Sequence, residues 1–501
     1  MKFYELPSNM NALLEKETTR FFVRVCFALS DGSFLFVKDS DIISCVINSY
    51  KSAEGGTVNI GELVLDNTSG IYSVEYNSEY TSDLNVLIYY AFGNSENSFL
   101  RFNLFADKNG FQCEQTGQKE KITKIKLVDL SEKLNDSKLQ NNWTDSQVLV
   151  DKVVCDKTQV ENSLVHLLAK RAGIDSSRIN AANLPFRIPY VKIDTTAWKE
   201  LCALARAYNA CVECGKDLLL SFTESPYDME NVFNDESGFF LNESNITHYR
   251  YFNKSENYAN NIRLKYTRYV ETERQELWTY SDSPVWYDEN MQACYPFTDD
   301  SRNIISNRNY EALYTAKNSE GLNRNVVYAK DISNVEEFAA GIVTSDNKQF
   351  EICKYDITTH PDKAIIQLGR NNQLIALYKA SIYGKAVISE TNFCVYVKDE
   401  KAIEKYGTLS KNVSSKYLSD DEIDGVPFYK KRAEDLLTEC KKFSKGYYVT
   451  TYLPLIHARV DAFMDLRVYE GGKIQKVKIE EVTFRYKKDC AFSSEFFVKT
   501  V

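Results

Sequence analysis

Several features that mark common protein classes are scarce in this chain of 501 residues. It has only 9 prolines and 20 glycines, too few for a collagen-like shaft or a long disordered linker. No stretch approaches the roughly 20 consecutive apolar residues of a membrane-spanning helix. Residues 1–8 lack a basic segment that leads into an apolar one, so we expect no signal peptide, and synthesis and assembly in the cytoplasm.

A surplus of positive charge is also lacking. The chain has 61 Lys and Arg against 70 Asp and Glu, a net charge of -9. A protein that wraps nucleic acid needs basic surface to displace counterions, so the composition argues against that class. The same charge is compatible with a channel through which DNA slides without being held.

Signatures of catalysis and metal binding are missing as well. There is no phosphate-binding glycine loop, no serine elbow and no helix-borne histidine pair. The one Cys-x-x-Cys, Cys211 to Cys214, would need two more zinc ligands, for which His166 and Cys202 are candidates. Positions three apart on a strand point to opposite faces, so we expect structural cysteines and no metal or cofactor.

Paired carboxylates need a separate hypothesis, because a glycosidase requires only two acids close in space. The candidate pairs are Asp299-Asp300, Asp420-Asp421-Glu422 and Glu480-Glu481. We interpret each as a solvated loop or strand edge and expect no catalytic residue. An aromatic cluster, Trp278, Tyr280, Trp286 and Tyr287, could stack on sugars, but we favour a role in the core of a loop-rich region.

Aromatic residues are abundant, with 33 Tyr and 28 Phe, and they favour β structure. Short strands separated by turns are predicted in the N-terminal part at residues 20–29, 34–37, 42–47, 61–66, 85–90, 99–105 and 122–128. This pattern is typical of a barrel or a sandwich.

A compact α/β unit follows. Apolar residues at helical spacing predict a helix over residues 158–173, with Gly173 as its C-cap signal. Residues 186–193 look extended, and a second helix is predicted over 194–208, with Asp194 as the N-cap candidate. A hairpin then turns at residues 215–217.

The remaining chain is read in less detail. Alternation predicts a strand at 260–270 and a strand pair within 385–397. Residues 429–443 form a charged amphipathic helix pattern. The last strands are predicted at residues 446–453, 462–469, 474–486 and 493–499.

This order of parts resembles hub proteins at the distal end of phage tails and related injection machines. The element from Trp198 to Phe222, a helix leading into a hairpin, is similar to that family's small inserted domain. The resemblance implies an α+β, predominantly β fold with two tail-tube-like β-barrel domains and small α/β inserted domains. The expected domains are a first barrel (1–145), an α/β domain (146–230), strands of the second barrel (231–275), an inserted β-rich domain (276–425) and the end of the second barrel (426–501).

The function that the resemblance implies is structural, not enzymatic. Two barrels per subunit in a homotrimer would form a pseudo-sixfold ring, a symmetry adaptor in the virion tail or baseplate. Its partners would be the tail tube protein, a distal tail or baseplate protein and a central spike, tip or fibre protein, with DNA only in transit during ejection. We expect that charge placed on residues 478–484 blocks ring assembly. The alternatives are a tail-associated cell-wall hydrolase and a carbohydrate-binding adhesin.

Overall fold

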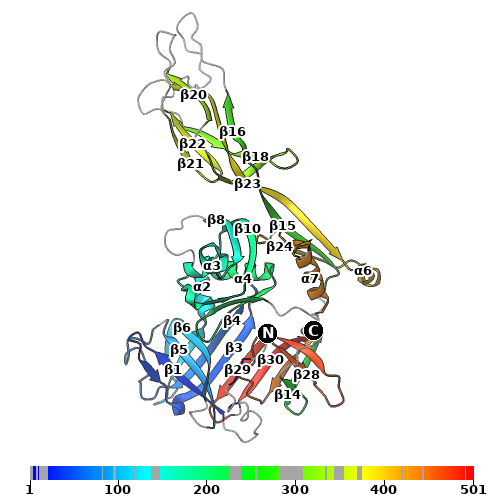
Figure 1. The fold of residues 1–501 in the computed structure, drawn as a ribbon. Coiled ribbons are helices and arrows are strands. Elements are labelled where there is room, and N and C mark those ends of the chain that lie inside the picture. The colour runs from blue at the N-terminus through cyan, green and yellow to red at the C-terminus, as the bar shows by residue number, and fades with distance from the viewer. Residues whose placement is uncertain are drawn as a thin grey trace, which may run out of the picture.

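The computed structural model describes most of the chain, and the fold is predominantly β with a few helices, as the sequence predicts (Figure 1). The described residues are 4–6, 10, 21–81, 83–93, 98–117, 119–136, 147–224, 239–253, 258–281, 309–332, 336–342, 355–368, 375–418, 421–423, 425–442, 445–490 and 492–500. Among them, no helix has the length and apolar character needed to cross a membrane.

One 16-stranded sheet forms the base of the molecule and contains strands from both ends of the chain, so blue and red strands lie side by side in Figure 1. Its main path is β14 (Ile246–Asn253), β27 (Lys445–Thr451), β30 (Ser493–Thr500), β29 (Gln475–Lys487), β3 (Ile42–Lys51), β4 (Thr57–Asp66), β7 (Lys121–Val128), β6 (Ser98–Gln115), β5 (Asn85–Phe92), β1 (Phe21–Ala28) and β2 (Phe34–Phe36). The branches are β9 (Ile179–Ala181), β11 (Ala210–Cys214), β12 (Leu220–Glu224), β13 (Phe240–Leu241) and β28 (Phe463–Leu466).

The two ends of the chain also share one hydrophobic core. Alternate residues of the strands point inward, as in β30, where every second side chain from Ser494 to Val498 is buried. Ile47 and Leu63 of the N-terminal strands and Phe484 and Val498 of the C-terminal strands belong to the same buried cluster. The sheet and core therefore join the strands predicted for two barrels into one body. The boundaries of the five domains stay a prediction.

The α/β unit sits above the N-terminal half of the main sheet (Figure 1). It contains α2 (Leu130–Asp136), α3 (Leu164–Arg171), α4 (Ala197–Ala207) and a separate two-stranded sheet of β8 (Gln147–Cys155) and β10 (Leu184–Ile193). The sequence reasoning missed α2 and β8. The hairpin β11–β12 continues this unit into the main sheet, where Glu213 pairs with Thr57 of β4.

The helix ends follow capping chemistry, with two corrections. The predicted helix 158–173 is shorter, because α3 begins only after a 3-10 turn at Val160–Asn162. It closes at Gly173, whose φ is 80°, and the Ile174 N–H donates to the Ala169 carbonyl, as in a Schellman motif. The predicted N-cap Asp194 is wrong: the side chain of Thr196 caps α4 by accepting from the Lys199 N–H.

Close packing fixes the α/β unit on the base. A Cβ atom added at Gly56, in the turn between β3 and β4, would lie 2.5 Å from the Trp198 ring and 2.7 Å from the Cys202 sulfur. Only glycine leaves room for these two side chains of α4. The turn thus determines how near the helix approaches the sheet.

The distal region extends away from the base along β15 (Asn261–Glu271) and β23 (Ile375–Lys398), at the top of Figure 1. A seven-stranded sheet contains β18 (Thr315–Lys317), β19 (Asn323–Lys330), β23, β15 and β24 (Ser410–Ser415), with β16 (Gln275–Ser281) and β20 (Glu336–Ile342) also on β23. A three-stranded sheet has the order β17 (Asn309–Leu313), β22 (Lys363–Leu368) and β21 (Tyr355–Thr359).

Two predictions for this region are corrected. Residues 260–270 do form a strand, β15, but it pairs with β23 and β24 and not with the second half of the main sheet. That place next to β27 is taken by β14. The predicted strand pair within 385–397 is part of the single long strand β23, which has several partners along its length.

Helical elements connect the distal region back to the base. They are α6 (Glu400–Tyr406) and α7 (Phe428–Lys442), with the short strands β25 (Glu422–Ile423) and β26 (Val426–Pro427) between β24 and α7. The predicted helix 429–443 is confirmed as α7, while α6 was missed. The side chain of Asp399 caps α6 by accepting from the Ala402 N–H at 3.1 Å.

Candidate assembly surface

The first open edge of the main sheet is β2. This strand pairs only with β1 among the described residues, from Cys26–Phe36 to Ala28–Phe34. Its three side chains, Phe34, Leu35 and Phe36, are 61%, 38% and 53% exposed. An unpaired, apolar strand edge is a template for another strand, which soluble monomers normally hide.

The second open edge, at the other end of the sheet, is β14. Its described partner is β27, with Tyr251 opposite Tyr447. The rings of this pair lie 5.3 Å apart, yet Tyr447 is buried whereas Tyr249 and Tyr251 are 44% and 48% exposed. Tyr251 therefore lies on the same face of the sheet as the buried Tyr447, but it is about half exposed.

The centre of the sheet, which we call the seam, is the pairing of β29 with β3. It runs from Glu481–Tyr50 to Lys487–Ser44. Phe484 on the seam is fully buried, and its ring lies 6.0 Å from Tyr90 and 5.8 Å from Phe102. Residues 478–484 do not form an open edge of the sheet, because β29 already pairs with β3, β28 and β30. That charge placed there blocks ring assembly stays a prediction.

A buried ionic cluster holds the seam to the α/β unit. The carboxylate of Asp461 lies 2.7 Å from the ammonium groups of both Lys51 and Lys478. It also accepts from the Cys211 thiol at 3.3 Å. Burial alone would raise the pKa of Asp461, but the two ammonium groups outweigh it and hold the pKa well below its usual range. The cluster joins β3, β29 and β11.

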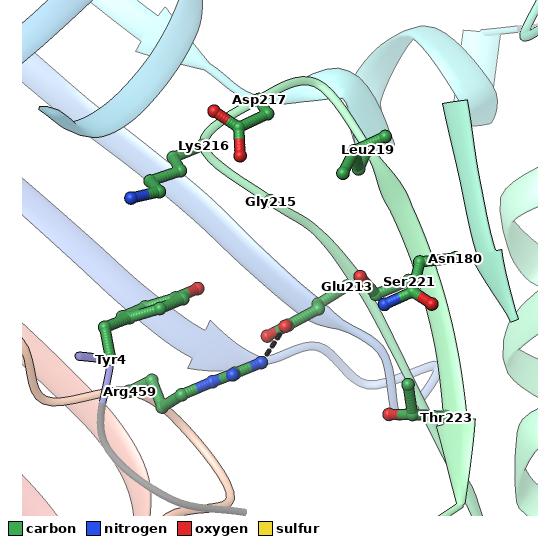
Figure 2. Close-up of a pocket in the computed structure, with 10 residues that line it drawn as sticks. All are labelled: Tyr4, Asn180, Glu213, Gly215, Lys216, Asp217, Leu219, Ser221, Thr223 and Arg459. Atoms are coloured by element: carbon green, nitrogen blue, oxygen red, sulfur yellow. Dashed lines mark hydrogen bonds and ion pairs between the residues drawn. The ribbon is translucent and has the colours of Figure 1, made fainter. Parts of the chain in front are cut away.

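A cavity of about 430 Å³ lies beside this cluster (Figure 2). Glu213 of β11 forms an ion pair with Arg459 in its wall, and the Arg459 guanidinium lies over the Tyr4 ring, 4.5 Å from the centroid. Lys216 and Asp217 of the hairpin turn line the opposite side. Because the Glu213 carboxylate is paired with a guanidinium, it is poorly suited to act as a general base. We interpret the ion pair as a contact that holds the β11–β12 hairpin to the main sheet.

The zinc candidates do not converge. His166 pairs with the Ser163 hydroxyl at 2.7 Å, and Cys202 and Cys214 belong to the core of the α/β unit, away from the Asp461 contact of Cys211. Burial raises the pKa of Cys202 to about 12 and of Cys211 to about 11, so both are neutral thiols near pH 7. No three metal-ligating side chains gather anywhere in the described ranges.

The carboxylate candidates have structural partners where the structure describes them. Asp421 accepts from the Arg187 backbone N–H at 2.7 Å. Glu480 pairs with Lys499 at 3.2 Å, and Glu481 accepts from Asn48 at 2.9 Å. Asp299, Asp300 and Asp420 lie outside the described residues. The expectation that the chain has no catalytic, cofactor or metal residue stays a prediction.

Half of the aromatic cluster can be placed. Trp278 and Tyr280 stand two residues apart on β16, with stacked rings 6.1 Å apart, and both pack against the distal core. This agrees with a packing role. Trp286 and Tyr287 lie outside the described residues.

The open edges were missed in the sequence, although a signal was present. Three consecutive apolar residues in the short strand 34–36, directly after the Asp31-Gly32 turn, leave no alternation that would bury one face. The individual strand β14, with Tyr249, Tyr251 and Phe252, was not predicted, although residues 231–275 were expected to contain strands of the second barrel.

Comparison with known proteins finds likeness in structure but not in sequence. No protein-family model and no curated protein sequence matches this chain. Among the similar solved structures is the 43 kDa tail protein of prophage MuSo2 from Shewanella oneidensis, with a TM-score of 0.48 and 9% identity over 96% of this chain and 98% of that chain. A tail protein from Neisseria meningitidis has a TM-score of 0.48 and 9% identity over 96% of both chains.

A prophage tail protein from Listeria monocytogenes has a TM-score of 0.42 and 10% identity, over 95% of this chain and 94% of that chain. All three of these neighbours are tail proteins.

Proposed function

We propose that this chain is a structural hub protein of a phage-like tail or baseplate, whose copies join through the edges of the main sheet. The observation that carries the proposal is the pair of open edges, β2 and β14, at opposite ends of one continuous sheet. Each bears exposed apolar or aromatic side chains, Phe34 to Phe36 on one and Tyr249 and Tyr251 on the other. Strand addition would cover both.

The two edges are different surfaces, so contact between them is heterologous and closes into a ring when the rotation fits. Three copies, each with two barrel-like halves, would give the pseudo-sixfold ring. In this proposal the ring binds the tail tube protein on one side and a distal tail, baseplate, spike, tip or fibre protein on the other. DNA passes through the lumen, and the chain has no enzymatic activity.

The test is the mass of the purified chain in solution, measured by light scattering over a range of concentrations. We expect three times 57.6 kDa for the wild type. The edge variants Phe36→Lys and Tyr251→Lys should be monomeric, because a charge would be buried in each new contact. Leu313→Lys is the control, since Leu313 is exposed on β17 of the separate three-stranded distal sheet and should leave the trimer intact.

Two outcomes would contradict the proposal. One is a wild-type chain that stays monomeric at every concentration and in the presence of a tail tube protein. The other is a trimer that all three variants form equally well, which would mean that the contact lies elsewhere.

A further inference from the structure

A groove of about 860 Å³ lies between the α/β unit and the distal region. It opens where β24 turns away from β15 after Ser415, with α4 on one side and α7 on the other. Its apolar floor includes Leu264, Tyr266 and Leu436. We call it the β24 groove.

Positive charge dominates the wall of the β24 groove. Arg206 and Lys411 line it, and neither has an acidic partner among the described residues. Lys265 also lines it, but in the register of β24 with β15 it lies on the other face of the sheet from Lys411. Among the described residues, the ammonium group of Lys411 donates to an uncharged partner, the Cys440 sulfur, at 3.5 Å. A cationic site in a chain with net charge -9 stands out against the general charge.

The other charged side chains of the groove are already paired. The buried Arg432 guanidinium donates to the Glu439 carboxylate at 2.8 Å and to the Arg206 carbonyl at 3.1 Å. Lys416 lies 2.9 Å from the Glu200 carboxylate. The only acid among the lining residues, Glu439, is therefore neutralised, and the two remaining cations, Arg206 and Lys411, have no counter-charge from described residues.

The groove also contains a free strand edge. β24 is the last strand of its sheet and pairs, among the described residues, only with β15, in parallel register from Asn261–Ser410 to Tyr266–Ser415. Most of its side chains are exposed. Its outer backbone N–H and C=O groups are thus available to another strand.

We propose that the β24 groove binds an extended acidic segment of a partner protein, which adds to β24 as a further strand. In the register of β24 with β15, Lys411 lies on the same face of the sheet as Leu264 and Tyr266 of the floor. Alternate side chains of an added strand point to that face, so they can include acids that meet Lys411 or Arg206 and apolar residues that pack on the floor. This docking does not depend on ring formation, because the groove lies apart from β2 and β14.

Nucleic acid also carries negative charge, but the free strand edge favours a peptide. Backbone N–H and C=O groups in alternation pair with another peptide backbone, whereas a phosphate chain offers acceptors only. A single-stranded oligonucleotide therefore serves as the competing probe.

The test uses the full chain and a fluorescein-labelled octapeptide of alternating Thr and Glu, followed by fluorescence anisotropy at low salt. We expect saturable binding that weakens as salt is raised. The charge reversals Arg206→Glu and Lys411→Glu together should weaken it about tenfold or more, since each turns an attraction into a repulsion. Lys473→Glu, in the exposed 470–473 turn, is the matched charge-reversal control and should bind like the wild type.

Cross-linking locates the peptide independently of affinity. A carbodiimide joins a peptide carboxylate to a nearby lysine amine, with loss of water, and mass spectrometry should identify Lys411 as the site. Failure of the Thr-Glu peptide to bind, equal binding of a Thr-Lys peptide, equal loss in Lys473→Glu, or tighter binding of oligothymidylate would each overturn the proposal. The same would follow if, without peptide, the carbodiimide joined Lys411 to a carboxylate of a second copy of this chain.

Discussion

The seam and the edges of the main sheet use similar aromatic strands with opposite outcomes. At the seam, Phe484 is enclosed by Tyr90 and Phe102 of the N-terminal strands and is fully buried. At the edges, Phe36 and Tyr251 extend the same sheet but remain exposed. One chain thus satisfies the pairing of its two halves internally and leaves equivalent strand surfaces open at both ends.

This difference separates folding from assembly. Side chains at the seam stabilise the chain itself, because their removal from water happens when the chain folds. Side chains at the edges contribute little burial free energy until another copy covers them. Substitutions at the two places should therefore act on different measurements.

The largest expected effect is at the seam. Phe484→Lys places a charge without a partner in the core and removes the ring contacts with Tyr90 and Phe102. We expect a loss of more than about 4 kcal/mol in the free energy of unfolding, seen by urea denaturation or as failure to fold. Tyr251→Lys, the same kind of change at an edge, should shift it by less than about 0.5 kcal/mol. Equal losses at both sites would remove the distinction between seam and edge.

The next effect concerns the ionic cluster beneath the seam. Asp461→Asn leaves Lys51 and Lys478 buried without a counter-charge, and we expect a loss of about 3–5 kcal/mol near pH 7. Because the folded pKa of Asp461 lies below its unfolded value of 3.8, its stabilisation is complete above that pH and is lost as the pH falls below it. The difference between wild type and Asp461→Asn should therefore shrink on acidification below about pH 4 in thermal melts.

That prediction has a control in the same part of the molecule. Glu495→Gln removes only an exposed ion pair with Arg485. Its effect on the melting temperature should be small at every pH from 3 to 7. A constant difference between wild type and Asp461→Asn over this range would contradict the role of the carboxylate charge.

The smallest effect is expected where the distal arm meets the α/β unit. Arg187 lies 2.6 Å from Asp151 and 2.9 Å from Glu271, and all three side chains are partly exposed. Arg187→Gln should reduce stability by less than about 1 kcal/mol, and less still in high salt, because exposed ion pairs are weak and screened. A loss as large as that of Asp461→Asn in urea denaturation would show that this contact is part of the folded core.

Much of the local structure could be predicted. The helix that ends at Gly173, the hairpin around residues 215–217 and most strands of the main sheet follow from capping residues, turn residues and hydrophobic alternation. These signals act over a few neighbouring residues. They failed where two local candidates competed, as with Asp194 and Thr196 at the start of α4, because the choice depends on which side chain reaches a free N–H.

The partners of strands could not be predicted in the same way. Residues 260–270 are a strand from their alternation alone, but the sequence does not encode locally that β15 pairs with β23 and β24 while β14 pairs with β27. Likewise, the acids of 480–481 and the cysteines of 211–214 gave no sign of the charged groups near them. Several of these neighbours come from segments more than 200 residues away, as with Cys211 and Asp461 or Glu481 and Asn48.

By itself, therefore, the sequence determined the predominantly β class, the position of most helices and strands and the resemblance to tail hub proteins, since these depend on residue type and short spacing. Only the tertiary structure decided that β29 belongs to a closed seam, that β2 and β14 are the open edges, and that Arg206 and Lys411 line one groove. The physical reason is that exposure and charge balance are properties of surfaces, and a surface exists only after distant strands have paired.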